Sequence, residues 1–149
     1  YGYGTSAFGE GWALYSEQLA LEAGLATDPY DEIGILQSEL FRAVRLVVDT
    51  GIHYKKWTRE EAMNYMKEKT GMSDTEVRSE IERYIVWPGQ ALSYKVGMLK
   101  ILELRQMAMD ALGNDFNYKE FHSILLDNGE PPLFILERLV KSWIALKQS

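Results

Sequence analysis

Cysteine is absent from the 149 residues of this sequence, and only two histidines are present. The lack of cysteine excludes disulfide frameworks, thiolate metal sites and cysteine nucleophiles. A catalytic zinc site needs three protein ligands, commonly histidines, but His53 and His122 lie too far apart in the sequence to form a His-x3-His pair. The chain therefore does not supply the common set of zinc ligands from its own residues.

Positive charge is also scarce, with 16 Lys and Arg residues against 22 Asp and Glu residues and a formal net charge of −6. This balance argues against a nucleic-acid partner, because proteins that bind the phosphate backbone need a basic face. No apolar run approaches the ~20 residues of a membrane-spanning helix. The hydrophobic share of 46% and the charged share of 26% are typical of a globular domain.

Helix signals dominate the chain, and the period-two alternation of strands is hard to find. Residues 58–61 and 73–76 both have the capping-box form, in which a hydroxyl residue is followed three positions later by glutamate. Pro88 is expected to end one helix and to begin the next. The sequence predicts one all-α piece over residues 1–149, with about seven helices near residues 7–23, 31–55, 58–70, 73–86, 88–112, 117–127 and 131–147.

The first stretch that points to chemistry surrounds Glu10, which lies between two glycines early in a predicted helix. Glu17 follows seven residues later, so both carboxylates lie on one helix face, about two turns apart. A carboxylate on a helix can ligate a metal ion, and a second carboxylate can orient the ligands. The alternative is that Glu10 is a solvated acid in the first turn, where the helix dipole favours negative charge.

The second stretch is a polar stripe on a predicted helix that is otherwise apolar nearly all round. Its members follow one another at spacings of three, four and four residues: Arg42, Arg45, Asp49 and His53. Charges on a helix suited to burial must be paired or must face a cleft. We expect Asp49 to pair with Arg45 and with His53, either in a functional site or in an ion-pair network that only joins helices.

The third stretch contains Gln90 and Tyr94, which lie one turn apart and are expected to share a helix face. A phenol at the start of a helix can donate a hydrogen bond to a developing oxyanion. The alternative is a half-buried tyrosine that packs its ring and leaves its hydroxyl in solvent. The sequence contains no nucleophile elbow, phosphate loop or calcium loop.

Together these stretches resemble the C-terminal portion of a bacterial family known as domain of unknown function 885. The resemblance spans nearly the whole chain and rests on residues 10–17 (EGWALYSE), 42–53 (RAVRLVVDTGIH) and 83–97 (RYIVWPGQALSYKVG), with a closing segment at 121–133. Members of this family are regarded as zinc metallopeptidase-like, with a helical architecture similar to that of thimet oligopeptidase and carboxypeptidase Taq.

The resemblance implies a role for each candidate residue. Glu10 matches the glutamate expected to be the third zinc ligand, the other ligands lying on an upstream helix that is absent from this sequence. The catalytic residues implied by analogy are His53 and Tyr94, which would hydrogen-bond the tetrahedral intermediate, together with Arg45. Three further residues would hold these side chains in place without contacting the metal or the substrate: Glu17, Asp49 and Gln90.

The first residues bear on the extent of the protein, because Tyr1-Gly2-Tyr3-Gly4 has neither an initiator Met nor a signal-type start. We therefore expect the C-terminal half of a larger helical metallopeptidase-like domain, inactive alone and without tightly bound zinc. Its expected partners are the missing N-terminal part of its own chain, a peptide substrate in the complete protein, or another copy that covers an exposed apolar face. The resemblance further implies export to the periplasm or a membrane-anchored lipoprotein.

A non-catalytic helical module, which binds peptides or is purely structural, is the competing interpretation. The two interpretations differ in geometry, because a peptidase requires Glu10, His53 and Tyr94 to converge on one cavity.

Overall fold

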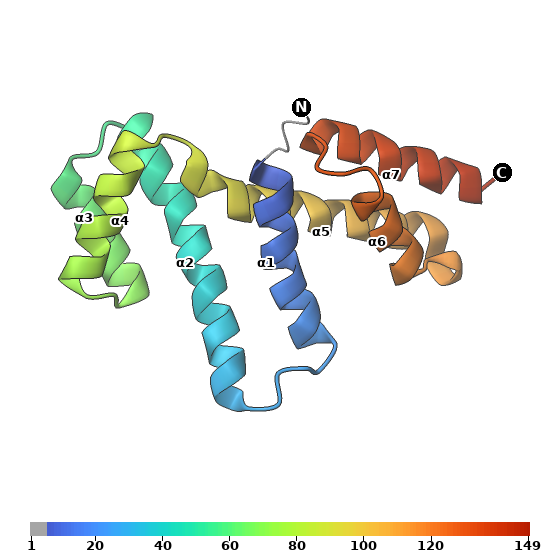
Figure 1. Ribbon diagram of the computed structural model, residues 1–149, viewed down its shortest axis with the longest axis horizontal. Coiled ribbons are helices and arrows are strands. Elements are labelled where there is room, and N and C mark those ends of the chain that lie inside the picture. Colours follow the sequence, from blue (N-terminus) through green and yellow to red (C-terminus); the bar gives the residue numbers. More distant parts are fainter. Residues whose placement is uncertain (1–5) are drawn as a thin grey trace.

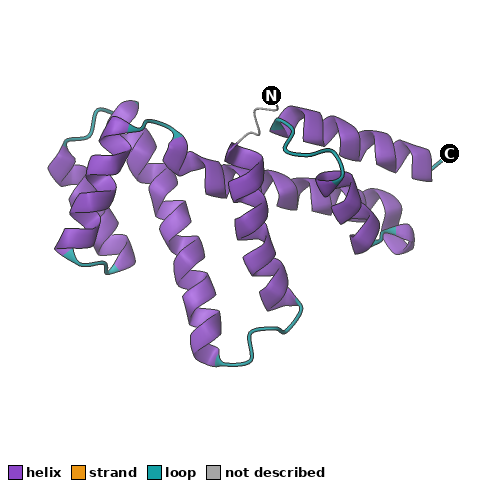
Figure 2. Ribbon diagram, viewed as in Figure 1, coloured by secondary structure: helices purple, strands orange, loops and turns teal. Residues whose placement is uncertain are grey.

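The computed structural model describes residues 6–149, and every regular element in that range is helical (Figures 1 and 2). The predicted all-α fold is confirmed, with seven α-helices and two short 3-10 helices in the described range. In chain order they are α1 (Ser6–Glu22), α2 (Pro29–His53), α3 (Arg59–Thr70), α4 (Asp74–Val86), η1 (Gln90–Leu92), α5 (Ser93–Leu112), η2 (Gly113–Asp115), α6 (Tyr118–Leu126) and α7 (Leu133–Lys147).

Local capping sets most helix ends. Thr58 and Ser73 both form the predicted capping boxes at the starts of α3 and α4. The expectation of a continuous helix from residue 88 is wrong, because Gly89 adopts a left-handed conformation with φ of 81°. The chain therefore makes a turn and the short η1 before α5 begins at Ser93.

Helix α5 crosses the molecule, and α1 and α2 project from it as two arms joined by residues 23–28 (Figure 1). Helices α3 and α4 pack beside α2, whereas α6 and α7 lie toward the other end of α5. The crossing of α1 and α5 is very close, because a Cβ atom added to Gly97 would lie 1.8 Å from the carbonyl oxygen of Ala7. Two glycines, Gly11 and Gly97, thus allow the two backbones to touch.

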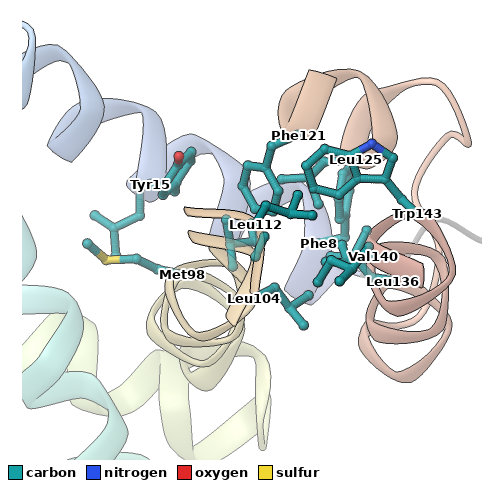
Figure 3. Close-up of a cluster of buried hydrophobic side chains, with 14 residues drawn as sticks. Phe8, Tyr15, Met98, Leu104, Leu112, Phe121, Leu125, Leu136, Val140 and Trp143 are labelled. Carbon is teal, nitrogen blue, oxygen red and sulfur yellow. The ribbon is translucent and has the colours of Figure 1, made fainter. Parts of the chain in front are cut away.

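The buried apolar side chains form two clusters. The first cluster joins α1, α5, α6 and α7, and Figure 3 shows Phe8 of α1 close to Leu136 and Val140 of α7. The second cluster joins α2, α3, α4 and η1, and its buried members are Val44, Val48, Ala62, Met66, Val77, Ile81, Tyr84 and Ala91. Of the polar and charged side chains between residues 6 and 149, only Arg45 and Asp49 are classed as buried, and both belong to α2 beside the second cluster.

Candidate functional site

Arg45 occupies the junction of α2, α4 and α5, with only 2% of its surface exposed. Its guanidinium carbon lies 4.6 Å from the ring centroid of Tyr94, and the rings of Tyr84 and Phe41 lie 5.5 and 5.6 Å away. Its Nε atom is buried without a hydrogen-bond partner. Across residues 6–149, no carboxylate pairs with this cation, so aromatic faces and one amide hold it instead.

That amide belongs to Gln90, whose Oε1 accepts hydrogen bonds from Arg45 Nη2 at 3.1 Å and from Arg83 Nη1 at 3.4 Å. Two cations on the same side fix the orientation of the amide, because its NH2 group would be repelled there. The Nε2 atom of Gln90 and the hydroxyl of Tyr94 form no hydrogen bond within the described part of the chain. The structure therefore brings Arg45, Gln90 and Tyr94 together and leaves two donors free.

Asp49 is buried but does not pair as expected. Its two carboxylate oxygens accept hydrogen bonds from the backbone N–H of Gly89, at 3.2 and 3.1 Å. No ion pair joins Asp49 to Arg45 or to His53 in the described range, which corrects the predicted network. The physical reason is the turn at Gly89, whose backbone N–H points at both carboxylate oxygens and takes the place of a cationic partner. Asp49 thus holds the turn that leads to Gln90.

His53 lies at the end of α2, where its Nε2 is 2.9 Å from the backbone oxygen of Tyr84. A carbonyl oxygen only accepts, so Nε2 carries a proton and donates it. This bond ties the end of α2 to the last turn of α4. Nε2 is therefore occupied, and Nδ1 is the atom left for a ligand. The structure does not bring His53 into direct contact with Tyr94, and its catalytic role stays a prediction.

Glu10 and Glu17, two of the three glutamates of α1, form no hydrogen bond or ion pair within residues 6–149. Glu17 lines a hollow between α1 and α2. Glu10 lies two turns earlier on the same helix face, which is the face turned toward α2. The contact of Gly11 with Gly97 also sets this part of α1 against the first turns of α5, the helix that carries Tyr94.

The donor set fits a single metal ligand but not a whole metal site. Across residues 6–149, no group of three or more His, Cys, Asp or Glu side chains could hold a metal ion. Both histidines are engaged, His53 with Tyr84 and His122 with the hydroxyl of Tyr15 at 2.9 Å. Glu10 is partly buried and free of protein partners, which suits one ligand to an ion whose other ligands lie elsewhere.

Sequence reasoning missed part of the network around Arg45. Glu80 of α4 accepts hydrogen bonds from Arg83 Nη2 at 2.6 Å and from the hydroxyl of Tyr84 at 2.5 Å. Burial alone would raise the pKa of Glu80, but these two hydrogen bonds outweigh it and lower the pKa. Burial and the bond to Glu80 raise the pKa of the Tyr84 phenol. The spacing of three and four residues from Glu80 was the available signal.

The comparisons with known proteins agree with this architecture. A chain from Colwellia psychrerythraea, described as a "putative lipoprotein", is 57% identical with a TM-score of 0.92, over 95% of this chain and 24% of that one. A "putative lipoprotein of unknown function" from Shewanella oneidensis is 28% identical with a TM-score of 0.88, over 93% of this chain and 26% of that one. This chain thus spans about a quarter of the length of either relative.

No functionally curated protein shows a significant match. Within residues 6–149, no helix combines the length and hydrophobicity needed to cross a bilayer. The model of the family described as "Bacterial protein of unknown function (DUF885)" matches residues 1–140. The chain therefore belongs to the DUF885 family of bacterial proteins.

Proposed function

We propose that this chain is the C-terminal part of the catalytic domain of a zinc-dependent peptidase. The observation that carries the proposal is the pair of free donors, the Gln90 amide and the Tyr94 hydroxyl, set by the buried Arg45. Donors fixed in advance stabilise the charge that develops on a carbonyl oxygen during peptide hydrolysis. In this proposal Tyr94 and Gln90 donate to the substrate carbonyl, and Arg45 is the positioning residue for both.

Glu10 supplies one carboxylate ligand to zinc in the complete protein. When bound, the metal polarises the carbonyl group and lowers the pKa of a water molecule to near neutrality. Glu10 suits this role because no protein partner competes for its oxygens in the described range. One carboxylate holds zinc weakly, so the isolated chain is inactive and has no tightly bound metal.

The remaining residues maintain the geometry of the site. Asp49 holds the Gly89 turn, and this turn presents Gln90. His53 fixes the end of α4 through Tyr84, and its Nδ1 faces a ligand in this proposal. Glu17 lies on the same face of α1 as Glu10, and in this proposal its carboxylate helps to orient the metal ligands.

The names of the two relatives, both described as a "putative lipoprotein", support a proposal about location. We propose that the complete protein works outside the cytoplasm, in the periplasm or attached to a membrane by a lipid anchor. Fractionation of cells that produce the full-length protein tests this, and recovery from the cytosol alone contradicts it.

The partner of this chain is proposed to be the rest of its own protein. A stripe along α2 leaves Ile33, Leu36, Leu40 and Val47 between 39% and 50% exposed. Such a stripe needs an apolar cover. Light scattering tests this proposal: the isolated chain should self-associate through the stripe, whereas the full-length protein should not.

Substitution of Glu10 in the full-length protein tests the function. We expect Glu10→Gln to lose zinc, measured by metal analysis after dialysis, and to lose peptidase activity on a mixture of short peptides. Tyr94→Phe should keep zinc and reduce kcat by about 10²-fold or more, because it removes only a donor to the transition state. Glu32→Gln is the matched control, since Glu32 is an exposed acid of α2 without an ion pair in the described range.

Unchanged zinc affinity in Glu10→Gln would contradict the ligand assignment. Absence of hydrolysis by wild-type protein that contains zinc would contradict the peptidase function and favour the alternative of a non-catalytic helical module.

A further inference from the structure

We propose that the face of α2 that carries Gly34, Ser38 and Arg42 is the floor of a groove for a short peptide, bound by its two charged ends. The inference rests on the proposed function, in that it takes this peptide to be the substrate. Two hollows of about 460 and 520 Å³ lie on this face, one toward the end of α3 and one toward α1. Both are lined by Gly34 and Ser38, so they adjoin one another across α2.

Gly34 and Ser38 have small side chains, so they leave space above this face of α2. A Cβ atom added to Gly34 would meet no atom within 4 Å, so nothing in the described chain fills the space above it. The apolar stripe of α2 lies on the opposite side of the helix, because Leu36 and Val47 are rotated by about half a turn from Gly34 and Ser38. Leu40 is the one residue of the stripe that also lines the hollow toward α3, so a cover over the stripe meets the groove at this edge and leaves the floor at Gly34 and Ser38 open.

Arg42 forms the cationic end of the groove. Its guanidinium carbon lies 4.9 Å from the ring centroid of Phe41 and 4.8 Å from that of Tyr94, so two aromatic faces hold it. Its Nε atom is buried without a partner, and none of its nitrogen atoms forms a hydrogen bond or ion pair within residues 6–149. A guanidinium fixed in this way is suited to a carboxylate, which it can bind through two parallel hydrogen bonds.

The opposite end of the groove is anionic. Glu17 of α1 and Asp31 of α2 line the same hollow from its two walls, and no cation pairs with either in the described range. The first 41 residues of the sequence contain no Lys or Arg that could neutralise them. An ammonium group placed between these carboxylates gains two charge-assisted hydrogen bonds. This is the chemistry of a peptide amino terminus.

The distance between the two ends sets the length of the ligand. Asp31 and Arg42 are eleven residues apart on α2, which corresponds to about 16 Å along the helix axis. An extended peptide advances about 3.3 Å per residue, so about five residues span the groove. Between the ends, apolar residues of the lining suit apolar side chains of the peptide, among them Leu25, Ile35, Phe41 and Met72. The carboxylate end lies beside Tyr94, the proposed donor of the active site.

Calorimetric titration of the full-length protein tests the groove. The probe is a five-residue peptide of alanine and leucine with N-methylated internal amides, so that it resists cleavage, and with both ends free. Blocking its carboxylate as an amide, or its amine by acetylation, should each weaken binding by about tenfold or more. Arg42→Gln should remove the preference for the free carboxylate. Glu17→Gln with Asp31→Asn should remove the preference for the free amine, and Glu32→Gln should retain both preferences.

Gly34→Leu places a side chain above the floor of the groove, where its Cβ atom meets no atom of the described chain within 4 Å, so it tests the site even if Arg42→Gln fails to fold. We expect it to abolish binding while leaving the melting temperature unchanged. Equal affinity for free and blocked peptides, no binding at all, or wild-type binding by Gly34→Leu would each overturn the groove. Equal hydrolysis of peptides with free and blocked ends would contradict the groove but not the peptidase activity. Binding that depends on the free ends, without hydrolysis, would contradict the peptidase activity but not the groove.

Discussion

The two clusters differ in how completely the polar side chains beside them are paired. In the first cluster the polar side chains satisfy one another. The hydroxyl of Tyr15 lies 2.9 Å from His122 Nε2, and Arg105 forms two hydrogen bonds with Glu22, of 2.8 and 2.9 Å. These bonds pin α1 to α5 and α6. The first cluster is therefore a framework in which little hydrogen-bonding capacity is left over.

Beside the second cluster, two opposite charges are buried four residues apart on α2 and do not pair. Both carboxylate oxygens of Asp49 accept from the backbone N–H of Gly89, and the Nε atom of Arg45 has no hydrogen-bond partner. An orphaned buried donor costs about 1–3 kcal/mol, so each one in a folded protein calls for an explanation, of which an absent ligand or ion is one. The comparison shows that the polar groups joining α1 to α5 and α6 are paired within the chain, whereas the junction of α2 with α4 and α5 keeps a buried donor without a partner.

The largest expected effect comes from the helix crossing in the first region. Gly97→Ala should destabilise the protein by about 3 kcal/mol or more, because the added methyl group lies 1.8 Å from the Ala7 carbonyl oxygen and forces α1 away from α5. Urea denaturation measures the loss. Gly34→Ala is the control, since its methyl group meets nothing within 4 Å. Equal stability of the two variants would show that the crossing is not tight.

A pair of arginine substitutions sharpens the contrast between the two regions. Arg45→Met removes an unpaired buried cation, so we expect stability within about 1 kcal/mol of wild type, while hydrolysis by the full-length protein is lost. Arg105→Met breaks two bonds to Glu22 and should cost about 1–2 kcal/mol. Thermal melts and activity assays separate these outcomes. Strong destabilisation by Arg45→Met would make Arg45 a structural residue.

The fold was largely predictable because its signals are local. Capping boxes at Thr58 and Ser73 act over three residues, and the structure contains both. The start of α5 was not predictable in this way. Its delay depends on Gly89, whose left-handed turn is stabilised by Asp49, a residue forty positions away. Such a contact exists only after α2 and α4 have packed together.

The candidate site was predictable in part for the same reason. Helical spacing placed Arg45 and Asp49 on one stripe, and it allowed them to pair. It did not reveal that a backbone amide and aromatic rings from other helices would compete for each charge. Spacing also gave no indication that Gln90 would accept from two arginines, because these arginines lie on separate helices.

Capping substitutions test whether the difference between the regions extends to local structure. Ser73→Ala at the start of α4 and Asn117→Ala at the start of α6 each remove a side-chain acceptor for backbone N–H groups. We expect similar costs of about 1 kcal/mol in both regions, measured by urea denaturation. A much larger cost for one cap would mean that the regions also differ in how strongly their helices depend on local signals.

The smallest expected effect is a pH dependence of the first cluster. Burial, and then the nearby charge of Arg105, lower the pKa of His122 below its ordinary value of 6.5. Below pH 6.5 the unfolded chain therefore binds a proton that the folded chain does not, and stability falls as the pH falls. The window from pH 7.5 to 5 separates this effect from that of Glu22 and Glu80, because hydrogen bonds lower the pKa of both carboxyl groups below the ordinary value.

His122→Gln provides the test of this pH dependence, because glutamine does not titrate and can still hydrogen-bond Tyr15. Circular dichroism melts of this variant should show a smaller decline in melting temperature between pH 7.5 and 5 than wild type shows. Identical declines would mean that His122 is protonated as readily in the folded protein as in the unfolded chain. The first cluster would then tolerate a buried cation as the second cluster does, and the contrast between the two regions would rest on hydrogen bonding alone.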